Sequence, residues 1–281
     1  MECRPLIRPQ RSAFGRSITP ALVVVLLLSV ATSTHAQVAA PTRSALDDIT
    51  VRGRALAEYD FAAWHATDAV EALKPKDGTI TSYIARPTPK GWAAVFGTLT
   101  ANRDTFLVAY EAIRSAQTGP FEGFAAIAHP LAVADTGYYA RAARGIDVAR
   151  KDFGSVTRPY NSAVLPLPDG SWYVYLMPAQ TVAGVFPLGA DTRYLVSPDG
   201  RTIREKRRLH NSVIEFRQVR PPQPGATMEA GTHTAVLADI PEDTDVFHVL
   251  VRTPRIPEYI MTDHFVYRVE TDGTIKFLGQ H

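Results

Sequence analysis

The sequence predicts an α+β protein, built predominantly from antiparallel β-sheet with two main helices. Two stretches place apolar residues three, four or seven positions apart, which is the spacing of one helix face. Most other apolar runs are short, and turn sequences separate them, including four Asp-Gly pairs. Asp-Gly between apolar runs is typical of tight hairpins, which join antiparallel strands. The sequence therefore predicts hairpins and a meander rather than a parallel sheet.

The first helix is expected over residues 44–73 and the second over residues 135–153. Ser44 caps the first helix, and Asp135 or Thr136 caps the second. Between the helices, apolar and polar residues alternate in four runs with short breaks, as in a meander of strands. These four predicted strands cover residues 79–86, 92–100, 105–113 and 121–128.

The remainder of the chain is expected to be almost wholly β-structure. Asp-Gly turns predict three hairpins, whose strands cover residues 163–167 and 172–177, 193–196 and 202–210, and 265–270 and 274–278. The proline-rich segment 220–225 favours an extended backbone and forbids helix. We predict that residues 37–281 form a single α+β domain, with a sub-boundary at this segment as the alternative.

The first 36 residues have the composition of a cleavable export signal. Four arginines precede an apolar run over residues 21–31, and Thr34-His35-Ala36 follows it. A basic start, a short apolar core and a small-x-small exit are the three parts of such a signal. Eleven residues span about half of a ~30 Å hydrocarbon core, so no permanent membrane span is predicted. We expect cleavage after Ala36 and a mature protein in the periplasm or secreted.

Removal of this segment changes the charge and the cysteine content. The whole chain has 30 basic and 28 acidic residues and a net charge of +2; residues 37–281 retain 26 and 27, a net charge of −1. Nucleic-acid binding proteins usually present a basic surface, so no nucleic-acid partner is predicted. The basic run at residues 204–208 is interpreted as a charged edge strand. Because Cys3 is the only cysteine, disulfides and thiolate chemistry are excluded from the mature chain.

No motif with a fixed chemical mechanism occurs in the sequence. It contains no glycine-rich phosphate loop, no serine nucleophile elbow and no His-Glu-x-x-His zinc motif. The leading hypothesis is therefore a non-catalytic periplasmic binding protein or envelope accessory protein. Its partner would be a small ligand or an envelope protein.

An alternative hypothesis rests on histidines in the C-terminal β-rich region. If residues 233–237 and 246–250 form a hairpin, His233 and His248 lie on the same face as diagonal neighbours. Two imidazoles so placed could bind zinc, although a shift of one residue in the pairing would separate them. The acidic loop between the two runs is expected to be a solvated hairpin tip rather than a calcium site, since it lacks the required ligand spacing.

The metal hypothesis needs a third ligand. His264 is the predicted third ligand, and Asp263 and His210 are the other candidates to complete the shell. An open coordination position would make the protein a metal-assisted hydrolase. Apart from this zinc ion, no cofactor is predicted. A third hypothesis is a secreted inhibitor or immunity-type interaction protein, which would present an exposed patch instead of a cleft.

Overall fold

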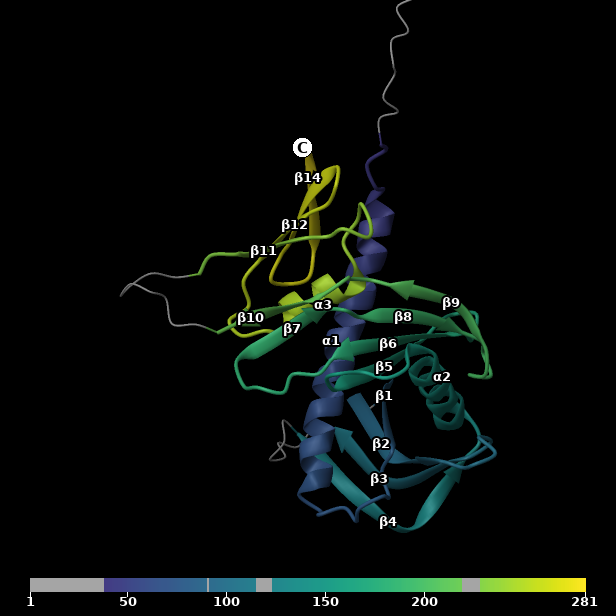
Figure 1. Cartoon of the computed structure of the whole chain (residues 1–281). Coiled ribbons are helices and arrows are strands. Elements are labelled where there is room, and N and C mark those ends of the chain that lie inside the picture. Colours follow the sequence, from purple (N-terminus) through teal and green to yellow (C-terminus); the bar gives the residue numbers. More distant parts are fainter. Residues whose placement is uncertain (1–37, 90, 115–122, 219–227) are drawn as a thin grey trace, which may run out of the picture. The chain divides into compact units, whose positions relative to one another are not determined.

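The structure is a computed structural model, and it describes residues 38–89, 91–114, 123–218 and 228–281. The predicted export signal and the proline-rich segment both lie outside the described residues. Residues 39–281 form one compact unit, whose elements Figure 1 shows in order. The described residues contain three helices and fourteen strands in four sheets, and almost all strand pairs are antiparallel. The predicted α+β fold class is confirmed.

Helix α1 spans Arg43–Glu71, close to the range predicted for the first helix. Its cap is Thr42 rather than Ser44, because the Thr42 hydroxyl accepts a hydrogen bond from the Ala45 amide at 3.2 Å. The buried side chains of α1 include Leu46, Ile49, Leu56, Tyr59, Ala63, Ala66 and Val70. The first two contribute to one hydrophobic core and the others to a second, so this single helix contacts both cores.

The first sheet is the predicted meander. Its strands, in the order in which they pair, are β1 (Ser82–Thr88), β2 (Gly91–Leu99), β3 (Phe106–Arg114) and β4 (Phe124–Asp135). Strand β4 continues seven residues beyond its predicted end at residue 128, through Pro130. Because β4 is an edge strand, the missing amide hydrogen of Pro130 is tolerated there.

Helix α2 and the second sheet follow. Helix α2 spans Tyr138–Phe153, and the Asp135 carboxylate accepts hydrogen bonds from the amides of Gly137 and Ala140 at its start. The second sheet has the order β5 (Tyr160–Pro166), β6 (Trp172–Pro178), β8 (Thr192–Val196) and β9 (Ile203–Arg208). Helix α2 contacts strands of both the first and the second sheets. The basic run lies on β9, at the edge of its sheet, as interpreted from the sequence.

The three predicted hairpins are confirmed. In each turn the glycine of the Asp-Gly pair has a positive φ: 81° at Gly170, 76° at Gly200 and 86° at Gly273. Residues with a side chain rarely adopt this backbone region, which explains why glycine follows aspartate at all three turns.

The third sheet contains the main departure from the prediction. Its order is β11 (Gly231–Thr234), β12 (Glu258–Met261), β13 (Phe265–Val269) and β14 (Ile275–Gln280). Residues 246–250, expected to form a strand, lie in helix α3 (Asp243–Val251) instead. Strand β11 consequently pairs with β12 in parallel, because a helix connects them as a crossover. The predicted hairpin between the runs containing His233 and His248 is wrong.

Helix α3 packs closely against α1. A Cβ atom at Gly53 of α1 would lie 2.4 Å from Val246 Cβ and 2.7 Å from the Asp243 carbonyl oxygen, so only glycine permits this approach. The two remaining strands, β7 (Val185–Gly189) and β10 (Val213–Arg217), pair with each other. Among the described residues, no helix combines the length and the apolar character needed to cross a bilayer.

Candidate functional site

The acidic residues at the start of α3 are buried rather than solvated. Glu242 is 4% exposed, Asp243 0% and Asp245 1%, so the expectation of an exposed hairpin tip is wrong. Glu242 and Asp245 form a capping box, in which the Asp245 Oδ2 atom accepts the Glu242 amide at 2.7 Å. This motif satisfies amides of the first turn and fixes the position of both side chains.

Basic and phenolic groups from the second sheet and from α1 bind two of these acids. Asp243 accepts hydrogen bonds from Arg52 Nε at 2.8 Å, Tyr175 Oη at 2.8 Å and Arg193 at 2.5 Å. Arg207 donates to Glu242 at 2.5 Å. Burial nevertheless raises the pKa of Glu242 to about 7, against the opposing effect of Arg207. The start of α3 is therefore anchored by charged groups from elements far apart in the sequence.

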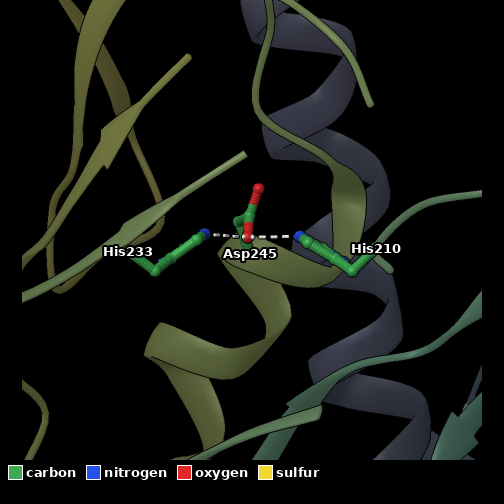
Figure 2. A group of neighbouring side chains, drawn as sticks. All are labelled: His210, His233 and Asp245. Atoms are coloured by element: carbon green, nitrogen blue, oxygen red, sulfur yellow. Dashed lines mark hydrogen bonds and ion pairs between the residues drawn. The ribbon is translucent and has the colours of Figure 1, made fainter. Parts of the chain in front are cut away.

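The third acid, Asp245, lies at the centre of a cluster of two histidines and three carboxylates. We call Asp191, His210, Asp245, His233 and Glu258 the histidine–carboxylate cluster. His210 contacts Asp191 Oδ1 through Nδ1 at 2.8 Å and Asp245 Oδ1 through Nε2 at 3.1 Å. His233 contacts Glu258 Oε1 through Nδ1 at 3.0 Å, and its Nε2 lies 3.0 Å from the same Asp245 Oδ1. Figure 2 shows the two imidazoles flanking the Asp245 carboxylate.

Arg252 extends this network of charges. The residue is 1% exposed, and its guanidinium donates to Glu258 Oε2 at 2.6 Å and to the Ile256 carbonyl oxygen at 2.7 Å. Carboxylates and cationic or ionisable groups thus alternate from Asp191 to Arg252. Buried charges are tolerated when they are paired in this way.

The neighbouring carboxylates control the protonation of both rings in the absence of any other cation. Burial disfavours the charged form of His210, but Asp245 and Asp191 outweigh it and raise its pKa to about 11. The same balance, with Asp245 and Glu258, raises the pKa of His233 to about 9. The two rings in turn hold the pKa of Asp245 far below its usual value, although burial opposes this shift.

The structure separates the three histidines predicted to bind zinc. Of the predicted set, only His233 belongs to the cluster. His248 lies on α3, where its Nε2 donates to the Phe186 carbonyl oxygen at 3.3 Å, and burial, followed by the charge of Arg252, lowers its pKa to about 4. His264 pairs with Asp239 at 2.8 Å, and Asp263 is exposed.

His210, named from the sequence as an additional candidate, does meet His233. In the part of the chain that the structure describes, the one group of three or more candidate metal ligands within 4.8 Å of one another is His210, His233 and Asp245. Sequence reasoning missed Asp245 because the acidic run was assigned to a turn. The capping-box spacing of Glu242 and Asp245, directly before an apolar run, was the signal that could have revealed it.

A cleft of about 1220 Å³ lies beside this cluster and is lined by residues of α1, α3, β2, β3, β5, β7 and the segment before β7. Its aromatic side chains include Phe61, Trp64, Trp92 and Phe247. Arg252 and His248 line it too, so the cleft shares these side chains with the surroundings of the cluster. The volume lies somewhat above the range of about 300–1,000 Å³ that is typical of small-molecule sites.

Four charged groups in the cleft, Glu58, Asp60, Arg114 and Arg255, form no ion pair with a described residue; Asp60 and Arg114 lie beside its aromatic rings. Asp60 makes no hydrogen bond or ion pair with any described residue, and burial raises its pKa to about 6. The Arg114 guanidinium lies 5.3 Å from the centre of the Phe61 ring and forms no ion pair with a described residue. Unpaired charges of both signs beside aromatic rings are typical of a ligand site.

Comparisons with known proteins add no relative to this description. No protein-family model, curated protein or solved structure matches the chain.

Proposed function

We propose that this protein is an exported binding protein whose cleft holds an amphoteric organic ligand with an aromatic or apolar group, such as a short peptide. The observation that carries the proposal is the presence, in one cleft, of aromatic rings together with the unpaired Asp60 and Arg114. Asp60 suits a ligand ammonium group, and Arg114 suits a ligand carboxylate through paired hydrogen bonds. Asn161 and Gln218 also line the cleft and supply amide donors and acceptors for a peptide backbone.

The state of His248, the one histidine among the described residues that line the cleft, disfavours it as an acid–base catalyst. His248 uses Nε2 to donate to Phe186, and Arg252 lies 3.5 Å from its Nδ1. Both ring nitrogens are therefore engaged, and the low pKa keeps the ring neutral. A general base needs a free nitrogen within hydrogen-bonding distance of its substrate, and His248 offers none.

The test uses one tripeptide, Phe-Gly-Phe, in four forms: free, N-acetylated, C-amidated and blocked at both ends. Trp64 and Trp92 line the cleft, whereas Trp172, the third tryptophan, is 3% exposed and lies elsewhere. We expect the free peptide to change the tryptophan fluorescence at the lowest concentration. Blocking either end should weaken binding by about tenfold, the loss of one charge-assisted hydrogen bond.

Two variants test which residue binds each charged end of the peptide. Asp60→Asn should abolish the preference for a free amino terminus, and Arg114→Gln the preference for a free carboxylate. Asp47→Asn and Arg43→Gln are the controls, because these residues form an exposed pair on α1 and do not line the cleft. Equal binding of all four peptides by the unmodified protein, or no binding of any, would contradict the proposal.

Export is the second part of the proposal, and it is supported by the composition of residues 1–36. Protein isolated from the periplasm or the medium should begin at Gln37 when its amino terminus is sequenced. Recovery of the intact amino terminus from the cytosol would refute it.

A second candidate function, the metal-assisted hydrolase, is favoured by one observation. A smaller cavity of about 340 Å³ is lined by His233, Glu258 and Arg252, so a reactant there would reach the cluster. Zinc-dependent hydrolysis of p-nitrophenyl acetate, lost in His233→Gln, is the outcome that would favour this function over simple binding.

A further inference from the structure

The geometry points to a site for a divalent transition metal, in which His210 Nε2, His233 Nε2 and a carboxylate oxygen of Asp245 are the ligands. This inference goes beyond the proposed ligand binding, because it concerns the buried cluster and not the cleft. It also differs in two of its three ligands from the set predicted from the sequence.

The first argument is a nitrogen atom without a hydrogen bond. His233 Nε2 is buried and has no hydrogen-bond partner, although Asp245 Oδ1 is only 3.0 Å away. The distance is short enough for a hydrogen bond, but the alignment is not met. The contact with Asp245 is an ion pair when the ring is protonated, but a buried nitrogen without an aligned hydrogen bond is held less favourably than one that has it. A metal ion bound to this nitrogen would satisfy it.

The second argument is how the opposite nitrogens are held. His210 Nδ1 lies 2.8 Å from Asp191 and His233 Nδ1 lies 3.0 Å from Glu258, both carboxylates. Metal-binding histidines usually donate their second N–H to a carboxylate or a carbonyl oxygen, which fixes the tautomer and directs the other nitrogen at the metal. Both rings of the cluster have this arrangement, and both direct Nε2 toward one carboxylate.

The third argument is the spacing of the three ligand atoms. Metal–ligand bonds of about 2.0–2.1 Å in a tetrahedral zinc site place neighbouring ligand atoms about 3.3 Å apart. The distances from Asp245 Oδ1 to the two Nε2 atoms are 3.1 and 3.0 Å, and all three residues offer atoms within 4.8 Å. Small rotations of the side chains would therefore suffice to bring them around one ion.

The charges also match a dication. Asp191, Asp245 and Glu258 supply three negative charges, and the guanidinium of Arg252, bound to Glu258 at 2.6 Å, supplies one positive charge. With both rings protonated the sum is zero, and a divalent cation that replaces their two Nε2 protons keeps it at zero. A buried site that is neutral as a whole avoids the large cost of an uncompensated charge.

The ligands come from three separate elements that hold them firmly. His210 follows β9, His233 lies on β11, and Asp245 lies in the capping box of α3. Gly231 contributes indirectly, because a Cβ atom there would lie 2.0 Å from Glu258 Oε2 and displace the carboxylate that orients His233. Two imidazoles and one carboxylate suit zinc and similar borderline ions better than calcium or magnesium, which prefer oxygen ligands.

The experiment uses the purified full chain, stripped with EDTA and desalted. Titration with Co²⁺ should give visible absorption bands that saturate at one equivalent, and Zn²⁺ should displace the Co²⁺. Zn²⁺ should also raise the melting temperature, because it binds the folded state. His210→Gln and His233→Gln should weaken Co²⁺ binding by more than about tenfold. His264→Gln and His65→Gln should bind Co²⁺ as the unmodified protein does.

The unmodified protein alone decides the inference if a variant fails to fold. No stoichiometric Co²⁺ or Zn²⁺ binding, together with an unchanged melting temperature, would show that the cluster is an ion-pair network only and would overturn the proposal. Equal loss of binding in His264→Gln would overturn it as well, because the ion would then lie elsewhere.

Discussion

The cleft and the histidine–carboxylate cluster are neighbours that differ in whether their charged side chains have ionic partners. In the cleft, Asp60 and Arg114 have no ionic partner among the described residues, and Trp64 is 61% exposed. In the cluster, every carboxylate has a cationic or ionisable partner, and the central Asp245 is 1% exposed. Charges that face open space are available to a ligand that diffuses in. Charges buried inside the protein can stabilise its fold or bind an ion small enough to reach them.

Arg252 lies at the boundary between the two regions. Its guanidinium binds Glu258 of the cluster and lies 3.5 Å from His248, which lines the cleft. The two regions can therefore be separated by experiment only with substitutions placed on one side of Arg252.

The largest effect is expected for Asp245→Ala. The substitution removes the carboxylate between His210 and His233 and also the capping box of α3. Removal of one partner from a buried ionic network costs about 3–5 kcal/mol, because the remaining charges stay buried without compensation. Urea denaturation of metal-free protein should show this loss in the free energy of unfolding. Asp47→Ala, at an exposed site on α1, should change it by less than about 0.5 kcal/mol. A similar small change in Asp245→Ala would mean that the cluster contributes little to stability.

A smaller effect is expected for Gly53→Ala, which tests how firmly α3 is held. The new Cβ atom would lie 2.4 Å from Val246 Cβ, so the two helices must separate. Overpacking of this kind typically costs about 1–3 kcal/mol. The displacement of α3 should also weaken Co²⁺ binding, because Asp245 lies on that helix.

Two further variants sharpen this prediction. Val246→Ala in the Gly53→Ala background should restore part of the lost stability, because it removes atoms from the point of overlap. Val51→Ala, at a residue of α1 that is 64% exposed, is the control and should have little effect. Unchanged stability and unchanged Co²⁺ binding in Gly53→Ala would contradict the close packing of α1 on α3.

The two regions also differ in how far the sequence predicts them. The meander, α2 and three hairpins follow from patterns that are local in the chain: apolar spacing, a capping residue and Asp-Gly turns. Pairing between neighbouring strands needs no long-range information, so these elements and their order are predicted well. The extension of β4 through Pro130 was missed because proline is expected to end a strand, whereas an edge strand tolerates it.

The cluster depends on contacts that the sequence does not encode locally. The run Val246-Phe-His-Val-Leu250 is short and rich in β-branched residues, so its pattern does not distinguish a strand from a fully buried helix. Its helical form depends on the capping box and on burial against α1 at Gly53. Once α3 is a helix, Asp245 faces inward, and His210 and His233 reach it from elements 35 and 12 positions earlier in the chain. The assumed hairpin of His233 and His248 suggested a metal site, but the choice of ligands required the crossover.

The smallest effect, and the one that distinguishes the cleft from the cluster by its sign, is expected for Asp60→Asn. The pKa of Asp60 is raised by burial to about 6 in the folded protein, above the value of about 3.9 expected in the unfolded chain. Ionisation of Asp60 therefore destabilises the ligand-free protein, and the penalty develops as the pH rises from about 4 to 6 and is constant above. Asparagine removes the penalty. Because Asp60 is half-buried and partly screened, we expect a gain of about 1–2 kcal/mol at neutral pH and none below pH ~4. Urea denaturation across this pH range measures this gain in the free energy of unfolding, with Asp47→Asn as the control that shows no such dependence.

Asp60→Asn should also bind the free tripeptide less tightly, because stability gained at a ligand site is commonly accompanied by lost function. A loss of stability at neutral pH in Asp60→Asn would show that Asp60 has a partner in the folded protein and is therefore not available to bind a ligand.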